Sequence, residues 1–278
     1  METIKTIGDI RSILHEVPRS LGLVPTMGFL HKGHMALVRE AREQNKTVVV
    51  SLFVNPSQFE PHEDYDSYPR DYNSDLQKLK TAGVDFVFAP SVEELYPQGF
   101  DTSLDIGHIG SLLEGKYRTN HFNGVGLVVC KLLSIVRPEK TYFGQKDAQQ
   151  CVVVQKLNED LNLGTEIVII PTVREKDGLA ISSRNIYLSD EEKKDATLLY
   201  QSLKLASEMW RENIFDVAII KKQMTALLEK SPLINIEYIG VSDPVTLEEL
   251  SLMSKGTLVS IAARIGKARL IDNITLGD

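Results

Sequence analysis

Apolar runs of strand length alternate with helical patterns through the first two-thirds of the chain. The strand-like runs cover residues 21–26, 48–54, 84–89, 140–144 and 166–170. Patterns with helical spacing fill the intervals, at residues 33–45, 71–82, 123–136 and 147–161. Continuous apolar strands that alternate with helices are typical of a parallel sheet covered on both faces. This part of the sequence therefore predicts an α/β domain, whose ligands would bind beyond the carboxyl ends of the strands.

The pattern changes after Pro171. Residues 189–192 have the sequence of a capping box and predict a long helix to about Trp210, followed by a second helix near 216–230. Strand-like runs then cover residues 236–241, 257–263 and 268–274, the last two with hairpin-like spacing. Helices followed by strands favour a small α+β domain. We expect a first domain over residues 1–175 and a smaller C-terminal domain over residues 176–278.

Composition narrows the class of protein. The 278 residues carry a net charge of -7, which argues against a general nucleic-acid binder, because such a protein needs a basic face. The two cysteines, without CxxC spacing, exclude a disulfide framework. The N-terminus lacks the pattern of a signal peptide, and no apolar run approaches transmembrane length. We expect a cytoplasmic protein without a nucleic-acid or membrane partner.

The segment from Thr26 to His34 is the first candidate for chemistry. It follows a predicted strand, contains two glycines and opens a predicted helix. A helix N-terminus offers free N–H groups and partial positive charge to a phosphate, and the His31 and His34 imidazoles can add donors where charge builds up during nucleotidyl transfer. The order H-x-G-H after an opening strand is the signature of the nucleotidyltransferase superfamily that includes class I aminoacyl-tRNA synthetases. The acidic net charge counts against a tRNA synthetase.

Two further segments have the composition of phosphate-binding loops. Residues 142–150 form a second strand, glycine turn and helix start, in which Lys146 can place a point charge on a phosphate and Gly144 permits close backbone approach. Taken alone, this segment favours a solvated surface lysine beside a common β–α turn. Residues 174–185 combine hydroxyls with cations that could wrap a triphosphate, although a polar interdomain linker would have a similar composition.

Six separated motifs together resemble the pantothenate synthetase (pantoate–β-alanine ligase) family over essentially the full length of the chain. The motifs occupy residues 25–34, 53–59, 65–71, 121–125, 143–147 and 179–185. The resemblance implies a Rossmann-like N-terminal domain, a smaller α+β domain that closes over the site, and a homodimer. It also implies a two-step ligase, in which ATP and pantoate give pantoyl adenylate and pyrophosphate, and β-alanine then displaces AMP to give pantothenate.

The resemblance also assigns the site residues. His34 is implied as a proton donor, and His31, Lys146 and Arg184 are implied as further catalytic residues. Pantoate is assigned to Asn55, Gln58 and Gln150, with Gln58 also placed to meet β-alanine. Mg²⁺ is expected on the ATP phosphates rather than in a protein cage. Ile181 stands where the family usually has methionine, a change of little consequence if the side chain only packs. The implied ATP contacts are Met27, Gly28, Phe29, Leu30, His31, Lys32, Gly33, His34, Gly144, Gln145, Lys146, Asp147, Val173, Ile181, Ser182, Ser183 and Arg184.

Two alternative functions remain open from the sequence. An adenylyltransferase of the phosphopantetheine type shares the two-histidine turn, but such chains are usually much shorter and would leave Asn55, Gln58 and Gln150 idle. Release of AMP only in the presence of an amine separates the two activities. A non-catalytic nucleotide-binding protein is the other alternative, and pyrophosphate release that survives a His34→Ala substitution would favour it.

Overall fold

The chain folds into two compact units in the computed structural model, which describes residues 1–17, 20–61 and 63–277. Unit 1 comprises Met1–Ser111, Gly115–Gly144 and Gln150–Pro171. Unit 2 comprises Leu112–Glu114, Gln145–Gln149 and Thr172–Asp278. Two short segments from the first part of the chain thus belong to unit 2. The domains expected over residues 1–175 and 176–278 stay predictions.

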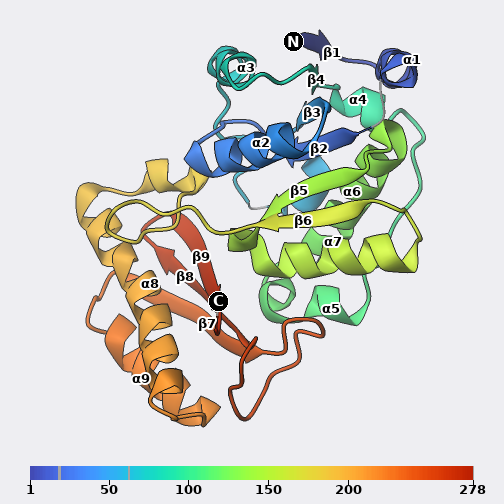
Figure 1. The fold of residues 1–278 in the computed structure, drawn as a ribbon. Coiled ribbons are helices and arrows are strands. Elements are labelled where there is room, and N and C mark those ends of the chain that lie inside the picture. The colour runs from blue at the N-terminus through green and yellow to red at the C-terminus, as the bar shows by residue number, and fades with distance from the viewer. Residues whose placement is uncertain (18–19, 62, 278) are drawn as a thin grey trace. The chain divides into compact units, whose positions relative to one another are not determined.

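Unit 1 is built on a six-stranded parallel sheet, as the alternation of strands and helices predicted (Figure 1). The strands follow the order β1-β4-β3-β2-β5-β6. The chain adds strands on one side of β2 and then crosses to its other side, so that the order reverses between β2 and β5. Such a switch point is where ligands bind in open α/β sheets. The strands are β1 Glu2–Ile4, β2 Leu21–Thr26, β3 Thr47–Leu52, β4 Phe86–Phe88, β5 Lys140–Gly144 and β6 Glu166–Ile170.

Helices cover both faces of this sheet. Residues of α2 and α3 share one buried cluster with the strands, and residues of α1, α6 and α7 share another. Helix α7 begins in the segment that belongs to unit 2 and continues in unit 1. The helices are α1 Ile7–Glu16, α2 Lys32–Gln44, α3 Tyr72–Thr81, α4 Val92–Leu95, α5 His108–Ser111, α6 His121–Val136 and α7 Ala148–Asp160, with the 3₁₀ turns η1 Pro56–Gln58, η2 Leu113–Lys116 and η3 Gln145–Asp147.

Helix α6 is the apolar helix that the sequence indicated, and it starts two residues earlier than predicted. Ten of its 16 residues are buried. It ends where Arg137 takes a left-handed conformation, with a φ of 53°, directly before Pro138. Among the residues that the structure describes, no helix is long and apolar enough to cross a membrane.

The first two elements were not predicted. Strand β1 has three residues, which is too short to show an alternation. Helix α1 did carry a local signal, because the Thr6 side chain caps it by accepting from the backbone N–H of Asp9 at 3.1 Å.

Unit 2 has the predicted α+β composition, with an antiparallel sheet in the order β7-β8-β9 (Figure 1). The capping box opens α8 as predicted, because Ser189 accepts from Glu192 at 3.2 Å and the Glu192 carboxylate accepts the Ser189 N–H at 2.7 Å. The predicted hairpin joins β8 to β9, with Ile265 opposite Ala268. The elements are η4 Ser183–Tyr187, α8 Asp190–Arg211, α9 Val217–Leu228, β7 Ile234–Ser242, β8 Leu258–Ile265 and β9 Ala268–Thr275.

A buried ion pair holds the 112–114 segment within unit 2. The Arg269 guanidinium donates to both oxygens of Glu114, one of them at 2.9 Å, and to Glu237 at 2.7 Å. Burial opposes the charge on Arg269, but the two carboxylates outweigh it and raise the pKa of Arg269. The Gln149 amide accepts the Glu114 N–H at 2.9 Å and donates to the Leu112 carbonyl at 2.8 Å. Every donor and acceptor named here is paired, which a buried charge requires.

Candidate active site

The site residues assigned from the sequence fall in both units. In unit 1 they follow β2, lie in and around η1, end β5 or lie in α7; they are Met27, Gly28, Phe29, Leu30, His31, Lys32, Gly33, His34, Asn55, Gln58, Gly144 and Gln150. In unit 2 they lie in η3, in the segment that leads into η4, and at the start of η4 itself; they are Gln145, Lys146, Asp147, Val173, Ile181, Ser182, Ser183 and Arg184. Gly144 and the turn after β2 stand at the carboxyl ends of the two strands that flank the switch point.

The turn between β2 and α2 has a left-handed backbone at two consecutive residues. Gly28 has a φ of 82° and Phe29 a φ of 50°. Glycine adopts this region freely, whereas a residue with a side chain is disfavoured there by about 1–2 kcal/mol. Thr26 supports the start of the turn, because its hydroxyl accepts the Gly28 N–H at 3.2 Å and donates to the Ser51 carbonyl at 2.7 Å.

Asp75 holds the strained part of this turn. The carboxylate lies in the first turn of α3, is 2% exposed, and accepts the backbone N–H groups of Phe29 and Leu30, each at 2.7 Å. Lys78, on the same helix, donates to the Leu30 carbonyl at 2.7 Å. Hydrogen bonds to an ionised acceptor are about twice as strong as neutral ones. The two hydrogen bonds to Asp75 therefore offset the cost of the Phe29 conformation and fix the backbone just before α2.

The two histidines stack at the N-terminus of α2. His31 is the N-cap residue, His34 lies in the first turn, and the ring centroids are 4.0 Å apart at an interplanar angle of 23°. The His31 backbone N–H donates to Nδ1 of His34 at 3.4 Å. Because a backbone N–H only donates, Nδ1 carries a lone pair here and the proton of the neutral His34 ring lies on Nε2. The arrangement orients His34 as an Nε2–H donor at a helix N-terminus.

Asn55 and Gln58 lie together at the short helix η1 after β3. Asn55 caps η1 and is 1% exposed, and its amide nitrogen donates to Gln58 Oε1 and to the Gly124 carbonyl, both at 3.1 Å. The close approach of α6 to η1 requires glycine at position 124, because a Cβ there would lie 2.1 Å from the Ser57 carbonyl oxygen. The Gln58 amide nitrogen donates to the Met27 sulfur at 3.2 Å, which links η1 to the turn after β2.

His121 anchors the backbone of Gln58. Its Nδ1 lies 2.8 Å from the Gln58 carbonyl, and its Nε2 lies 3.0 Å from the Arg118 guanidinium. A guanidinium only donates and a carbonyl only accepts, so the neutral ring carries its proton on Nδ1. Arg118 is held in turn by Glu63, at 2.5 and 2.7 Å. Burial would raise the pKa of Glu63, but the hydrogen bonds and charge of Arg118 outweigh burial and lower it below 4.5.

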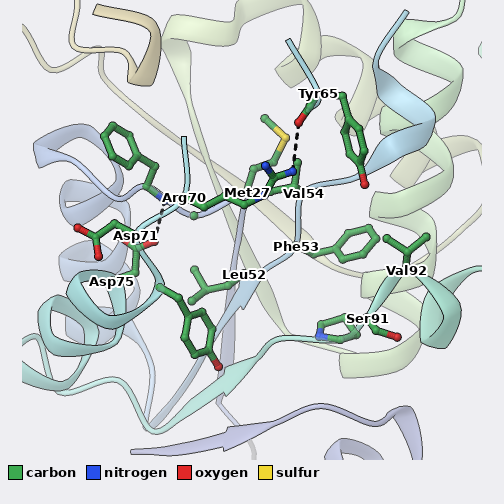
Figure 2. A pocket seen from close by; sticks show the side chains of 14 residues that line it. Met27, Leu52, Phe53, Val54, Tyr65, Arg70, Asp71, Asp75, Ser91 and Val92 are labelled. Atoms are coloured by element: carbon green, nitrogen blue, oxygen red, sulfur yellow. Dashed lines mark hydrogen bonds between the residues drawn. The ribbon is translucent and has the colours of Figure 1, made fainter. Parts of the chain in front are cut away.

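A cavity of about 290 Å³ opens at the carboxyl ends of β2, β3 and β4 (Figure 2). Its wall includes Met27, Gly28 and Phe29 after β2, residues 52–54 at the end of β3, and residues 90–92 after β4. Asp75 lines it as well, and the loop that leads into α3 contributes Tyr65 and residues 70–72 to the wall. Arg70 closes this loop on itself by donating to the carbonyls of Tyr65 and Tyr68, both at 3.1 Å. The turn after β2 thus forms part of a hollow at the expected edge of the sheet.

In unit 2, β9 holds the turn that carries Lys146. The Asn273 amide donates to the carbonyls of Gln145 and Lys146, both at 2.9 Å, and its oxygen accepts from the Gln145 amide at 3.2 Å. The Lys146 ammonium lies 3.3 Å from the Asp147 carboxylate, and its side chain is 20% exposed. The backbone around Lys146 is therefore fixed by a strand that is distant in sequence, at a separation of 127 residues.

The segment from Val173 to Arg184 folds back on itself within unit 2. The Ile181 N–H donates to the Val173 carbonyl at 3.0 Å, and the Ser182 hydroxyl accepts the Arg184 N–H at 3.3 Å. Arg174 fixes the base of this loop through hydrogen bonds of 2.5 and 2.8 Å to the buried Asp272. The Ile181 side chain is buried, as expected of a residue that only packs.

Among the described residues, no group of three or more His, Cys, Asp or Glu side chains is placed to hold a metal ion. Mg²⁺ sites in proteins commonly use only one or two carboxylates together with the phosphates of a bound nucleotide.

Comparison with known proteins assigns the family. The family model described as pantoate-beta-alanine ligase matches residues 2–275. The chain belongs to the pantoate–β-alanine ligase family. It is 48% identical over 276 residues to the pantothenate synthetase of Caldicellulosiruptor bescii, a match that covers 99% of this chain and 98% of the relative. The resemblance inferred from the six motifs is thus confirmed.

Solved structures of the family have the same fold. The pantothenate synthetase of Thermus thermophilus superposes with a TM-score of 0.95 at 44% identity, covering 99% of each chain. The pantoate-beta-alanine ligase of Francisella tularensis, complexed with beta-gamma ATP and beta-alanine, superposes with a TM-score of 0.83 at 33% identity, covering 99% of this chain and 97% of the relative. These matches confirm the predicted Rossmann-like fold with a smaller α+β part.

Several residues around these positions were missed from the sequence. Asp75, Tyr96 and Asn273 contact the predicted site residues through bonds that span 41 to 128 residues of sequence. None of the three stands in one of the six motifs. No periodicity or spacing rule could have found them, because each acts through a long-range contact.

Proposed function

We propose that this chain catalyses the ATP-dependent condensation of pantoate with β-alanine to pantothenate, through a pantoyl adenylate. A family match from residue 2 to residue 275 carries this conclusion. In the first half-reaction a pantoate carboxylate oxygen attacks the α-phosphorus of ATP, and the bond to pyrophosphate breaks. In the second, the β-alanine amine attacks the acyl carbon, loses a proton and expels AMP.

The geometry of the turn after β2 supports a role in the first half-reaction. The N-terminus of α2 attracts phosphate, and His34 presents an Nε2–H donor there. We assign His34 as the proton donor and His31 as its stacked partner. Negative charge builds up on the phosphates as pyrophosphate leaves, and preorganised donors stabilise such charge. The backbone from Met27 to Gly33 is assigned to ATP.

The assignments in unit 2 concern the phosphates of ATP. Lys146 and Arg184 are proposed as charged contacts, with Ser182 and Ser183 as hydroxyl donors. Gly144, Gln145, Asp147, Val173 and Ile181 are proposed as further ATP contacts. Mg²⁺ is proposed to bind through the phosphates, as the lack of a carboxylate cluster among the described residues favours. The homodimer and the cytoplasmic location remain predictions.

Pantoate is assigned to Gln58 and Gln150, and to Asn55, which is hydrogen-bonded to Gln58 at 3.1 Å. Gln58 is half-buried and already linked to Met27 of the ATP turn, which supports its assignment near the reacting carboxylate. Gln150 lies half-buried in α7.

An AMP-release assay with ATP, Mg²⁺ and pantoate, with and without β-alanine, tests the proposal. AMP that forms only with β-alanine supports the ligase. Pantoate-dependent exchange of pyrophosphate into ATP without AMP release would retain the adenylation step and reject the amine. Loss of both signals in a His34→Ala variant is expected, and their survival would contradict the role of His34.

A further inference from the structure

The hydrogen bonds around Asn55 are consistent with only one orientation of its side-chain amide. The Asn55 side-chain atom next to the Gly124 carbonyl must be its NH₂ group, because a carbonyl only accepts. The atom next to the Ser57 backbone N–H, at 3.4 Å, must be its oxygen, because a backbone N–H only donates. Two backbone groups therefore exclude the flipped amide, an ambiguity that side-chain partners alone would leave open.

Tyr96 completes this arrangement from α4's C-terminal end. Its hydroxyl donates to Asn55 Oδ1 at 2.9 Å, alongside the Ser57 hydroxyl, also at 2.9 Å. Burial raises the pKa of Tyr96, which the hydrogen bond to Ser57 offsets only in part, so that the hydroxyl keeps its proton. The Tyr96 ring is held by neighbours as well, with the Lys131 ammonium 5.4 Å from its centroid and the Phe100 ring centroid at 5.2 Å.

The orientation of the Asn55 amide also fixes the orientation of the Gln58 amide. The second N–H of Asn55 points to the Gln58 side chain, and the atom that receives it must be the oxygen, Oε1. The Gln58 NH₂ group is thereby turned the other way, toward Met27. Asn55 itself is 1% exposed, with both N–H groups and the oxygen engaged, so direct contact with a ligand would require breaking this network.

We propose that Tyr96 and Asn55 are positioning residues that fix the orientation of the Gln58 amide, so that Gln58 offers N–H donors and not its carbonyl oxygen to pantoate. This inference rests on the proposed function. A donor suits the carboxylate and hydroxyl oxygens of pantoate, whereas a carbonyl oxygen would repel the carboxylate. Asn55 thus acts on pantoate through Gln58, and Tyr96 acts through Asn55.

A Tyr96→Phe variant tests the chain of contacts while it keeps the aromatic ring. We expect the KM for pantoate to rise about fivefold, equivalent to about 1 kcal/mol for one lost hydrogen bond, with the KM for ATP unchanged. Tyr142→Phe is the matched control. Tyr142 is fully buried in the cluster that the strands share with α2 and α3, and its hydroxyl accepts from Asn45 at 2.6 Å. The control substitution should lower the melting temperature and leave the KM for pantoate unchanged.

A double-mutant cycle that combines Tyr96→Phe with Gln58→Ala tells whether Tyr96 acts by positioning Gln58 or by stabilising the fold in general. If Tyr96 acts through Gln58, then Tyr96→Phe has no further effect on the KM for pantoate in a Gln58→Ala background. An equal effect in both backgrounds, or a Tyr96→Phe variant that saturates with pantoate like the unmodified enzyme, would overturn the inference. Failure of the proposed function would be seen differently, as absence of pantoate-dependent AMP release in the unmodified enzyme.

Discussion

Asp75 and Phe29 are joined by a hydrogen bond of 2.7 Å, although they lie 46 residues apart in sequence. The bond connects a buried carboxylate of α3 to a backbone N–H in the left-handed turn that precedes the two histidines. Strained backbone persists where surrounding contacts hold it. The position of the histidines therefore depends on a helix that carries neither of them.

An Asp75→Asn substitution should slow the adenylation step. The amide keeps one acceptor for the Phe29 and Leu30 N–H groups but turns an NH₂ group toward the other donor. The loss of a charged hydrogen bond costs about 1.5–3 kcal/mol, or roughly a ten- to hundredfold fall in kcat/KM if the turn relaxes. Pantoate-dependent pyrophosphate exchange measures this rate.

Asp216→Asn provides the matched control for Asp75. Asp216 caps helix α9 by accepting the Ala218 N–H at 2.8 Å, and asparagine caps a helix as well as aspartate does. We expect this control to exchange pyrophosphate at the unmodified rate. Equal rates for both variants would contradict the role of Asp75.

A Lys146→Ala substitution should reduce the rate of adenylation. Removal of one preorganised charged group costs about 2–4 kcal/mol of transition-state stabilisation. The backbone carbonyl of Lys146 would still be held by Asn273, so the fold of the turn should survive. Single-turnover formation of the adenylate checks the prediction, and a rate that falls by less than about threefold would show that Lys146 is not one of these groups.

A Gln58→Ala substitution should raise the KM for pantoate more than the KM for ATP. The change removes the NH₂ group assigned to pantoate and leaves the His121 contact with the Gln58 backbone carbonyl intact. Initial rates at varied pantoate and varied ATP measure the two constants. Equal increases in both would mean that Gln58 does not recognise pantoate.

The Glu63–Arg118 pair should make stability depend on pH. The folded-state pKa of Glu63 lies below 4.5, because Arg118 outweighs the effect of burial. A group with a lowered folded pKa contributes stability above its unfolded pKa and loses it as the pH falls through the folded value. Glu63→Gln should therefore lower the free energy of unfolding by about 2 kcal/mol at pH 7, and the difference should shrink below pH 4.5.

Glu16→Gln is the control for this pH dependence. The Glu16 side chain is 84% exposed and pairs only at the surface with His15, where ion pairs contribute little. Urea unfolding at several pH values compares the two variants. A Glu63→Gln deficit that stays constant from pH 7 to below its folded pKa would contradict the charge-based explanation.

Local patterns predicted most of the regular structure. Strands β5 and β6 occupy residues 140–144 and 166–170, as their apolar runs indicated, and the Ser189–Glu192 capping box opens α8. The hairpin between β8 and β9 also lies where the sequence indicated. These features depend on residues within a few positions of one another, so the sequence displays them directly. Strand β1 escaped prediction because three residues are too few for a pattern.

The sequence by itself determined the alternation of strands and helices, the two-histidine turn and, through its six motifs, the family. The tertiary structure decided which distant residues hold the site residues in place. Asp75 accepts the Phe29 N–H, Asn273 donates to the Lys146 carbonyl, and the Tyr96 hydroxyl donates to Asn55. The fold also buries Asn55, with its amide nitrogen bonded to Gln58 and to the Gly124 carbonyl, and its assignment to pantoate stays a prediction. The physical reason is that these hydrogen-bond partners are 41 to 127 residues apart in sequence, so only the folded chain brings them together.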